Sequence, residues 1–182
     1  TFEDCMGGTH RIDGPWDMIL AFPPCTHIAV SGAKHFEKKR QDGRQREGIE
    51  FFCQFLKADC ERICIENPVN IISGKYIEQW FPDLAEQYQL PRSPSQSIQP
   101  FWFGDPAKKT TNLWLKGLPL LKPTNVVEPK LVHYTSGNGK QLTFSADYGV
   151  GFQTKHGRRR SKTYPGIAKA MAEQWAGKAE TT

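Results

Sequence analysis

Residues 21–25 (Ala-Phe-Pro-Pro-Cys) and residues 65–68 (Ile-Glu-Asn-Pro) decide the fold of this chain. Each stretch ends an apolar run typical of a buried strand, over residues 16–22 and residues 62–65. Between these runs, residues 44–58 carry apolar side chains at helical spacing, which predicts a helix. The pattern is strand, helix, strand, and a right-handed crossover of this size makes the two strands parallel neighbours.

The crossover brings a thiol and a carboxylate to one edge of the predicted sheet. Cys25 and Glu66 follow the carboxyl ends of their strands, the edge at which open α/β sheets bind ligands. A cysteine there can act as a nucleophile where N–H groups or cations favour its thiolate. A glutamate there can manage protons on an electrophilic ring, with Asn67 and Pro68 fixing its loop. Singly, each residue is more often a turn or capping residue, but the pair at crossover spacing favours a functional role.

Size and composition fit one α/β domain with a small appendage. The chain has 182 residues, 38% of them hydrophobic and 24% charged, and a net charge of +5. No stretch approaches the roughly 18 to 20 apolar residues of a membrane span, so we expect no membrane partner. The charge is compatible with a polyanionic partner and does not require one.

The cysteines bear on compartment and metal binding. Their number is odd and no signal peptide precedes them: Cys5, Cys25, Cys53, Cys60 and Cys64. We therefore expect reduced thiols and a cytoplasmic location. Histidines at finger-like spacing are missing, so we expect no metal site.

The remaining segments predict further elements. A helix interrupted at Pro82 is expected over residues 75–87, a strand hairpin over residues 97–115, and an amphipathic helix that packs on the sheet over residues 165–176. The charged residues 26–42 indicate either an active-site loop or a solvated face.

The expected organisation has three parts: an α/β core of residues 1–116, a loop-rich insert of residues 117–162, and a helix within residues 163–182. Within the insert, two short β-like runs are expected over residues 130–134 and 141–144. The insert ends in the densest basic cluster of the chain: Lys155, Arg158, Arg159, Arg160 and Lys162. Such a cluster can bind nucleic-acid phosphates, although a solvated basic loop has the same composition.

Together these motifs resemble the DNA cytosine-5 methyltransferases, and more closely the short methyltransferase-like proteins of phages and prophages. Residues 23–25 match the catalytic Pro-Pro-Cys and residues 66–67 match the Glu-Asn motif. Residues 103–115 are similar to the Tyr-Gly-x-Pro-Gln-x-Arg-x-Arg hairpin, and residues 164–168 are similar to the C-terminal helix that closes the cofactor pocket. The motifs follow the family order.

The resemblance implies a Rossmann-like methyltransferase fold with three α/β/α layers, incomplete at its N-terminus, and S-adenosylmethionine as cofactor. It implies that Cys25 adds to C6 of cytosine while Glu66 holds N3 and the exocyclic amine. The same correspondence gives the substrate-binding residues Pro23, Pro24, Asn67 and Lys109, the last at the position of an arginine directed to the base carbonyl. DNA is the expected partner, with its cytosine flipped out or single-stranded.

The chain departs from the family pattern at three points. Thr26 replaces the Gln that follows the cysteine, and Ala107, Lys109 and Thr111 replace the Gln-x-Arg-x-Arg pattern. The insert is short for a target-recognition domain. Nothing before Trp16 resembles the Gly-rich loop and the acidic strand end that hold the cofactor, so we expect either a missing N-terminal portion or a loss of cofactor binding.

Two alternatives to a DNA methyltransferase stay open. One is a catalytically inactive, nucleic-acid-binding or regulatory remnant in which Cys25 and Glu66 are kept by packing. The other is an enzyme that modifies a free pyrimidine nucleotide, which would suit the short insert. The oligomeric state does not follow from these motifs.

Overall fold

The computed structural model describes residues 2–3, 9–10, 15–72, 75–145 and 163–176. The chain forms two compact units. The first comprises residues 1–96 and 112–118, and the second comprises residues 97–111 and 119–182. Near the start of the chain, β1 (Phe2–Glu3) pairs antiparallel with β2 (Thr9–His10).

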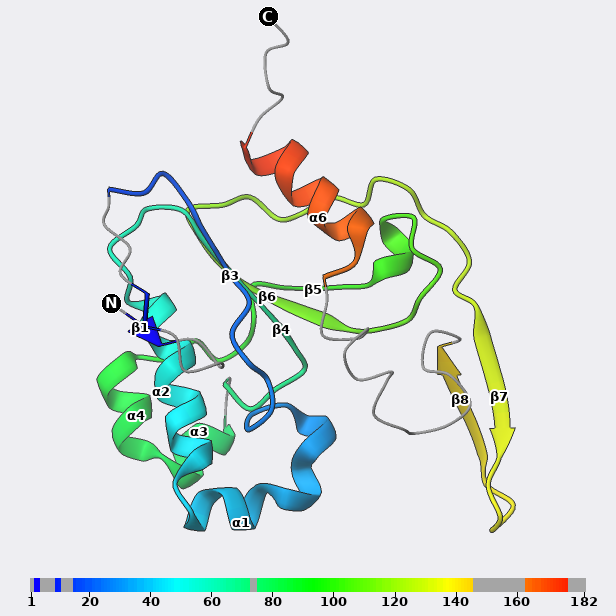
Figure 1. Cartoon of the computed structure of the whole chain (residues 1–182), viewed down its shortest axis with the longest axis horizontal. Coiled ribbons are helices and arrows are strands. Elements are labelled where there is room, and N and C mark those ends of the chain that lie inside the picture. Colours follow the sequence, from blue (N-terminus) through cyan, green and yellow to red (C-terminus); the bar gives the residue numbers. More distant parts are fainter. Residues whose placement is uncertain (1, 4–8, 11–14, 73–74, 146–162, 177–182) are drawn as a thin grey trace, which may run out of the picture. The chain divides into compact units, whose positions relative to one another are not determined.

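The first unit is built on a strand–helix–strand crossover. Strands β3 (Ile19–Ala21) and β4 (Ile63–Pro68) are parallel neighbours, with Ala21 paired to Ile65. Helix α2 (Arg44–Leu56) lies between them in the sequence, as Figure 1 shows. The predicted order and the parallel pairing are confirmed. Strand β3 is shorter than the predicted 16–22 at both ends, and two prolines that cannot donate to a ladder follow it closely. Strand β4 extends beyond the predicted residue 65 to Pro68, so Glu66 lies within the strand and not in a loop after it.

Helix α2 covers one face of these strands with its apolar side. Ile49, Phe52 and Cys53 are buried in one hydrophobic core with Ile63 and Ile65. Complete burial of a side chain the size of Phe52 contributes roughly 1.5–3 kcal/mol to the free energy of unfolding. Because successive side chains of a strand point to opposite faces, Ile63 and Ile65 define the face of β4 that packs against α2.

Gly48 lets α2 approach the turn that follows Cys25. A Cβ atom at Gly48 would lie 3.2 Å from Cβ of His27 and 3.3 Å from Cγ2 of Ile28. These distances are shorter than the optimal separation of about 3.5–4.0 Å between carbon atoms. The absence of a side chain at Gly48 therefore sets the spacing between helix and turn.

The charged residues 26–42 form a turn and two short helices, η1 (Val30–His35) and α1 (Phe36–Gln41). Phe36 is buried, and its ring contacts the Tyr76 ring edge-on at a centroid distance of 5.5 Å. Lys39 is only 8% exposed. The interpretation of this stretch as a solvated face is therefore wrong at Lys39, because α1 turns that side chain inward.

The helix predicted over residues 75–87 is present and is interrupted where expected. Helix α3 (Lys75–Trp80) ends just before Pro82, which begins α4 (Pro82–Tyr88). The Arg40 guanidinium lies 3.9 Å from the centre of the Trp80 ring and donates a 2.7 Å hydrogen bond to the Tyr76 hydroxyl. This contact ties α1 to α3.

Strands β3 and β4 belong to a four-stranded sheet in the order β3-β4-β6-β5, with β3 at an edge. Strands β5 (Gln96–Ile98) and β6 (Thr111–Lys116) are neighbours, as the predicted hairpin requires. Strand β5 ends earlier than predicted because Pro100, which has no N–H, begins the 3-10 turn η2 (Pro100–Trp102). The α/β class is confirmed, and the Rossmann-like three-layer arrangement stays a prediction.

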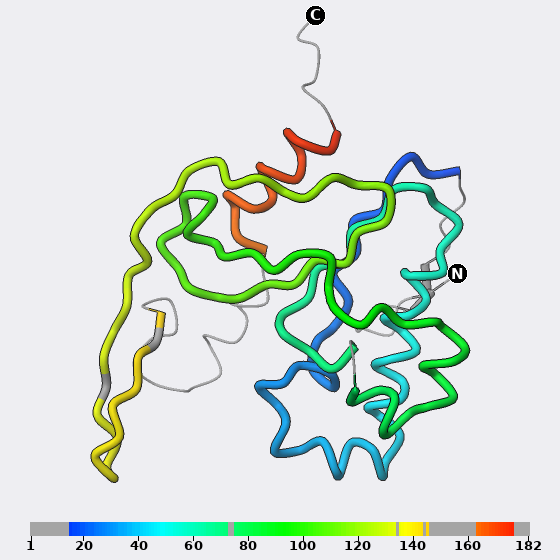
Figure 2. Tube along the Cα trace, turned by 180° about the vertical axis from the view of Figure 1, so that it is seen from behind, coloured from blue at the N-terminus to red at the C-terminus, as the bar shows by residue number. Residues whose placement is uncertain are grey.

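The second unit carries a β-hairpin within the predicted insert. Strands β7 (Leu131–Thr135) and β8 (Gln141–Ser145) pair antiparallel, and Figure 2 shows the extended stretch that leads into them. The Lys108 N–H donates a 2.9 Å hydrogen bond to the Ser145 hydroxyl. The two strands confirm the β-like runs predicted over residues 130–134 and 141–144 of the insert.

The predicted C-terminal helix is present as α6 (Pro165–Met171), which continues into the wider turn η4 (Ala172–Ala176). Its buried residues include Ile167, Met171 and Trp175, which belong to the predicted apolar stripe. The Gly166 N–H donates to a carboxylate oxygen of Asp105 at 2.8 Å. These interactions anchor the helix within the second unit.

Candidate active site

The parallel pairing of β3 and β4 brings the two predicted motifs to the same sheet edge. Because Ala21 lies opposite Ile65, the chain that leaves β3 runs beside the end of β4. The Asn67 side-chain amide donates a 2.7 Å hydrogen bond to the Pro23 carbonyl oxygen. Cys25 lies two residues beyond Pro23, and Glu66 directly precedes Asn67. The proline–cysteine stretch and the Glu-Asn stretch are therefore adjacent.

A chain of buried amides holds the Glu-Asn stretch in place. Asn67 is 1% exposed, and its side-chain oxygen accepts a 3.0 Å hydrogen bond from the Asn70 amide. The Asn70 side-chain oxygen in turn accepts the Ile72 N–H at 3.0 Å. Buried polar groups are costly unless they are paired, so this chain restricts the loop after β4 to one conformation.

The turn that carries Cys25 is fixed by backbone hydrogen bonds. The Cys25 carbonyl oxygen accepts the N–H groups of Ile28 and Ala29, at 3.1 and 2.8 Å. Ala29 also forms a bridge with Asn70, flanked by hydrogen bonds of Ile28 and Val30 to the same loop. The loops after the two strands are thus joined, and Cys25 is half-buried at their start.

Glu66 is half-buried and lies on the face of β4 that points away from α2. Cys64 shares this face two residues earlier. Burial raises the pKa of the Cys64 thiol to about 12, and the charge of Glu66 adds to the increase. Cys64 is therefore a neutral, buried thiol at physiological pH. Cys25, in contrast, is half-buried.

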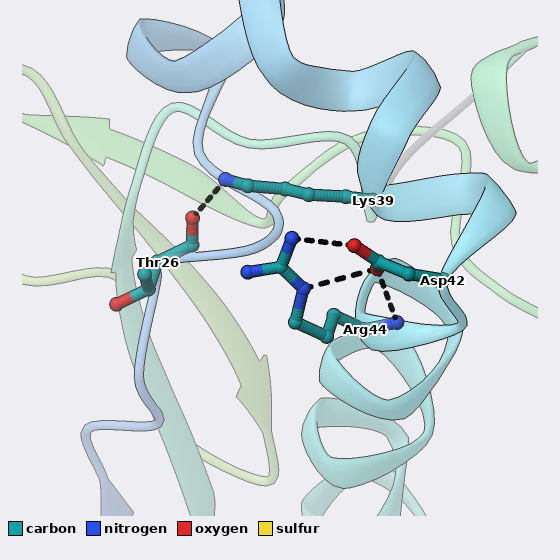
Figure 3. Close-up of polar contacts among 4 residues, drawn as sticks. All are labelled: Thr26, Lys39, Asp42 and Arg44. Carbon is teal, nitrogen blue, oxygen red and sulfur yellow. Dashed lines mark hydrogen bonds and ion pairs between the residues drawn. The ribbon is translucent and has the colours of Figure 1, made fainter.

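Basic groups gather beside the Cys25 turn. The Lys39 ammonium donates a 2.6 Å hydrogen bond to the Thr26 carbonyl oxygen (Figure 3). The Arg44 guanidinium pairs with Asp42 and lowers the pKa of that carboxyl below its usual range. The pKa of His27 is lowered, first by burial and then by the charges of Lys39 and Arg44. Of these groups, Lys39 places its charge directly against the turn, at the Thr26 carbonyl oxygen.

The other predicted substrate-binding residues have different surroundings. Pro23 is buried and Pro24 is exposed at the start of the turn. Lys109 belongs to the second unit, where its ammonium lies 5.8 Å from the centre of the Tyr164 ring. Its contact with a base stays a prediction. The basic cluster of Lys155, Arg158, Arg159, Arg160 and Lys162 lies outside the described residues.

A surface hollow of about 400 Å³ lies away from this edge, around Trp16, Asp17, Asp59 and Arg62. These residues precede β3 and β4, so the hollow is at the amino ends of the strands and does not belong to the candidate site. Within the described ranges, no group of His, Cys, Asp and Glu residues could hold a metal ion. No helix in those ranges has both the length and the apolarity to span a bilayer.

Sequence reasoning missed Lys39 and His27. Both belong to the charged stretch that was interpreted as a loop or a solvated face. The available signal was the position of Lys39 three residues after Phe36, on the same side of a helix. Comparison of the chain with protein-family models, curated proteins and solved structures gives no match.

Proposed function

We propose that this protein is a DNA cytosine-5 methyltransferase-like protein in which Cys25 attacks cytosine and Glu66 activates the ring. The observation that carries the proposal is the hydrogen bond from Asn67 to Pro23 across two parallel strands. It joins the two motifs on which the family resemblance depends.

The covalent step uses residues of this edge alone. The Cys25 thiolate forms a bond from sulfur to C6 of cytosine, while Glu66, as the acid, donates its proton to N3. The C5–C6 double bond opens, and its electron pair leaves C5 nucleophilic. Without another electrophile, C5 takes a proton from water. The hydroxide left by that water then takes a proton from C5, which restores the C5–C6 double bond, expels the Cys25 thiolate and returns the N3 proton to the Glu66 carboxylate.

S-adenosylmethionine would supply the methyl group in the family reaction. The described residues do not by themselves form a site for it, because β3 is the outermost strand of its sheet and no described Gly-rich turn adjoins it. We therefore assign the covalent addition to this chain and derive no step through the cofactor.

Exchange of the C5 hydrogen tests the proposal without a methyl donor. A single-stranded oligonucleotide with one cytosine deuterated at C5 is incubated with the protein in water. Loss of the deuterium is followed by mass spectrometry. We expect exchange with the wild-type protein, none with Cys25→Ser, and at least a tenfold slower rate with Glu66→Gln.

Glu61→Gln is the matched control, because Glu61 is exposed just before β4, at the opposite end of that strand from the candidate site. It should exchange at the wild-type rate. Equal exchange by Cys25→Ser and the wild type would refute the nucleophile assignment. Absence of exchange in the wild type, with duplex and single strand alike, would favour the non-catalytic alternative. Exchange of deoxycytidine monophosphate alone would favour the free nucleotide.

A further inference from the structure

The buried Lys39 ammonium is an unusual feature of the candidate site. Lys39 is 8% exposed, and its Nζ atom donates to the Thr26 carbonyl oxygen at 2.6 Å. Buried charges in proteins are generally paired with an opposite charge. Among the described residues, the ion pairs involve Arg44, Arg46 and Lys169, and none includes Lys39.

An ammonium group has three N–H donors, and the Thr26 carbonyl oxygen accepts one of them. In the described part of the chain, this is the one hydrogen-bond acceptor of Lys39. Two donors are therefore available for oxygen atoms of a ligand. A charged donor in a site of low dielectric binds an anionic acceptor more strongly than a neutral one.

Gly32 lies directly beside the ammonium. A Cβ atom at Gly32 would lie 3.4 Å from Nζ of Lys39 and 4.0 Å from the Thr26 carbonyl oxygen. A side chain at this position would occupy the approach to the Lys39–Thr26 contact.

His27 extends the same electrostatic pattern. Its Nδ1 atom is buried and has no hydrogen-bond partner within the described residues. The Lys39 and Arg44 charges oppose protonation of the imidazole, while Glu47 and Asp42 favour it to a smaller extent. Burial is the largest cause of the lowered His27 pKa, and the Lys39 charge adds to it, so Lys39 acts on the turn as a positive charge.

We propose that Lys39 and Gly32 form a subsite for a phosphate group of the nucleic-acid substrate, beside the turn that carries Cys25. The identity of the anion rests on the proposed function, because a cytosine within DNA carries a phosphate on each side of its sugar. Lys39 is a substrate-positioning residue in this proposal. Its phosphate contact holds the backbone while the base reaches the sheet edge.

The test is a double-mutant cycle on the binding of a single-stranded oligonucleotide with one cytosine. The reference oligonucleotide is compared with versions in which a neutral methylphosphonate replaces the phosphate on the 5′ or the 3′ side of that cytosine. One of the two replacements should weaken wild-type binding about tenfold or more, as expected for loss of a charge-assisted hydrogen bond.

Lys39→Met should bind the reference oligonucleotide about tenfold more weakly and should no longer distinguish phosphate from methylphosphonate. Its plot of log affinity against log salt concentration should be shallower by about 0.7. Lys38→Met is the matched control, since Lys38 is an exposed lysine on the same helix. It should keep the wild-type discrimination.

Gly32→Ala retains Lys39 and places a methyl group at the proposed approach, so it should also lose discrimination. This variant decides the matter if Lys39→Met does not fold. If a folded Lys39→Met variant still distinguished phosphate from methylphosphonate as the wild type does, the phosphate subsite would be overturned. If Lys39→Met does not fold, the same result with Gly32→Ala would overturn it. Equal wild-type affinity for all the oligonucleotides would overturn it as well.

The C5-exchange assay separates the two proposals. If the protein exchanges the C5 hydrogen but Lys39 does not affect the discrimination between phosphate and methylphosphonate, the proposed function is supported and the subsite is refuted. Discrimination without exchange supports the phosphate contact in a non-catalytic nucleic-acid-binding protein.

Discussion

The side-chain amide of Asn67 is hydrogen-bonded to the carbonyl oxygen of Pro23 at 2.7 Å, although the two residues are separated by 44 positions. This bond joins the ends of two parallel strands. It also belongs to a buried amide chain that continues through Asn70 to the backbone at Ile72. Asn67 therefore has a structural role that is independent of any substrate.

Replacement of Asn67 tests this role. Asn67→Ala leaves the Pro23 carbonyl and the Asn70 amide without a buried partner, so we expect the free energy of unfolding to fall by about 1–3 kcal/mol. Urea unfolding measures the change. Gln54→Ala removes an exposed amide from α2 and should change stability by less than about 0.5 kcal/mol. Equal effects of the two substitutions would contradict the role assigned to Asn67.

Thiol labelling should separate the cysteines of the first unit. Burial raises the pKa of Cys53 and of Cys64 to about 12. At pH 8 both thiols are therefore protonated as well as buried, while Cys25 is half-buried. We expect iodoacetamide to modify Cys25 in the folded protein and to modify Cys53 and Cys64 only after unfolding. Peptide mass spectrometry reports the order, and early modification of Cys64 would be inconsistent with its position.

His27 should make the protein less stable in acid. Its pKa lies below the usual value of 6.5 in the folded chain. Above pH 6.5 the imidazole is neutral in both states and contributes no pH dependence. Below pH 6.5 the unfolded chain binds the proton first, so the free energy of unfolding falls as the pH decreases. Urea unfolding between pH 7 and pH 5 should show this loss.

The His27→Asn variant should lose less stability than the wild type over that pH range. His35→Asn is the control, because His35 is exposed on the neighbouring η1. This variant should keep the wild-type pH profile. If both substitutions reduced the acid sensitivity equally, the effect would not arise from the burial of His27.

The start of α6 should not tolerate a side chain. A Cβ atom at Gly166 would overlap the Phe103 carbonyl oxygen within the second unit. Gly166→Ala should therefore lower the free energy of unfolding by about 1–3 kcal/mol and speed hydrogen exchange in α6. Gly137→Ala, in the open turn between β7 and β8, has no heavy atom near its added methyl group and should leave that exchange unchanged.

Much of the first unit could be predicted because its signals are local. Apolar periodicity located α2, and the apolar runs located β3 and β4. The position of the Glu-Asn stretch beside the Cys25 turn then followed from the crossover rule, which makes the two strands parallel neighbours. These features depend on short-range pattern and chain connectivity, which a sequence displays directly.

The surroundings of the Cys25 turn could not be predicted in the same way. Lys39 lies in a run of charged residues, where composition favours exposure. It lies on the same short helix as Phe36, whose ring packs against Tyr76 across 40 positions of the chain, and its ammonium reaches back to the Thr26 carbonyl oxygen. Strand β5 was predicted too long because the apolar run continued past Pro100, whose missing N–H breaks the ladder.

The close approach at Gly48 has a consequence for mutational tolerance. Because Gly48 has no side chain, the backbone of α2 packs directly against the turn after Cys25. A bulky residue at this point would displace the turn that carries Cys25 without replacing either Cys25 or Glu66. The conformation of that turn can therefore be altered from the helix face that packs against it, which makes position 48 an entry point for engineering.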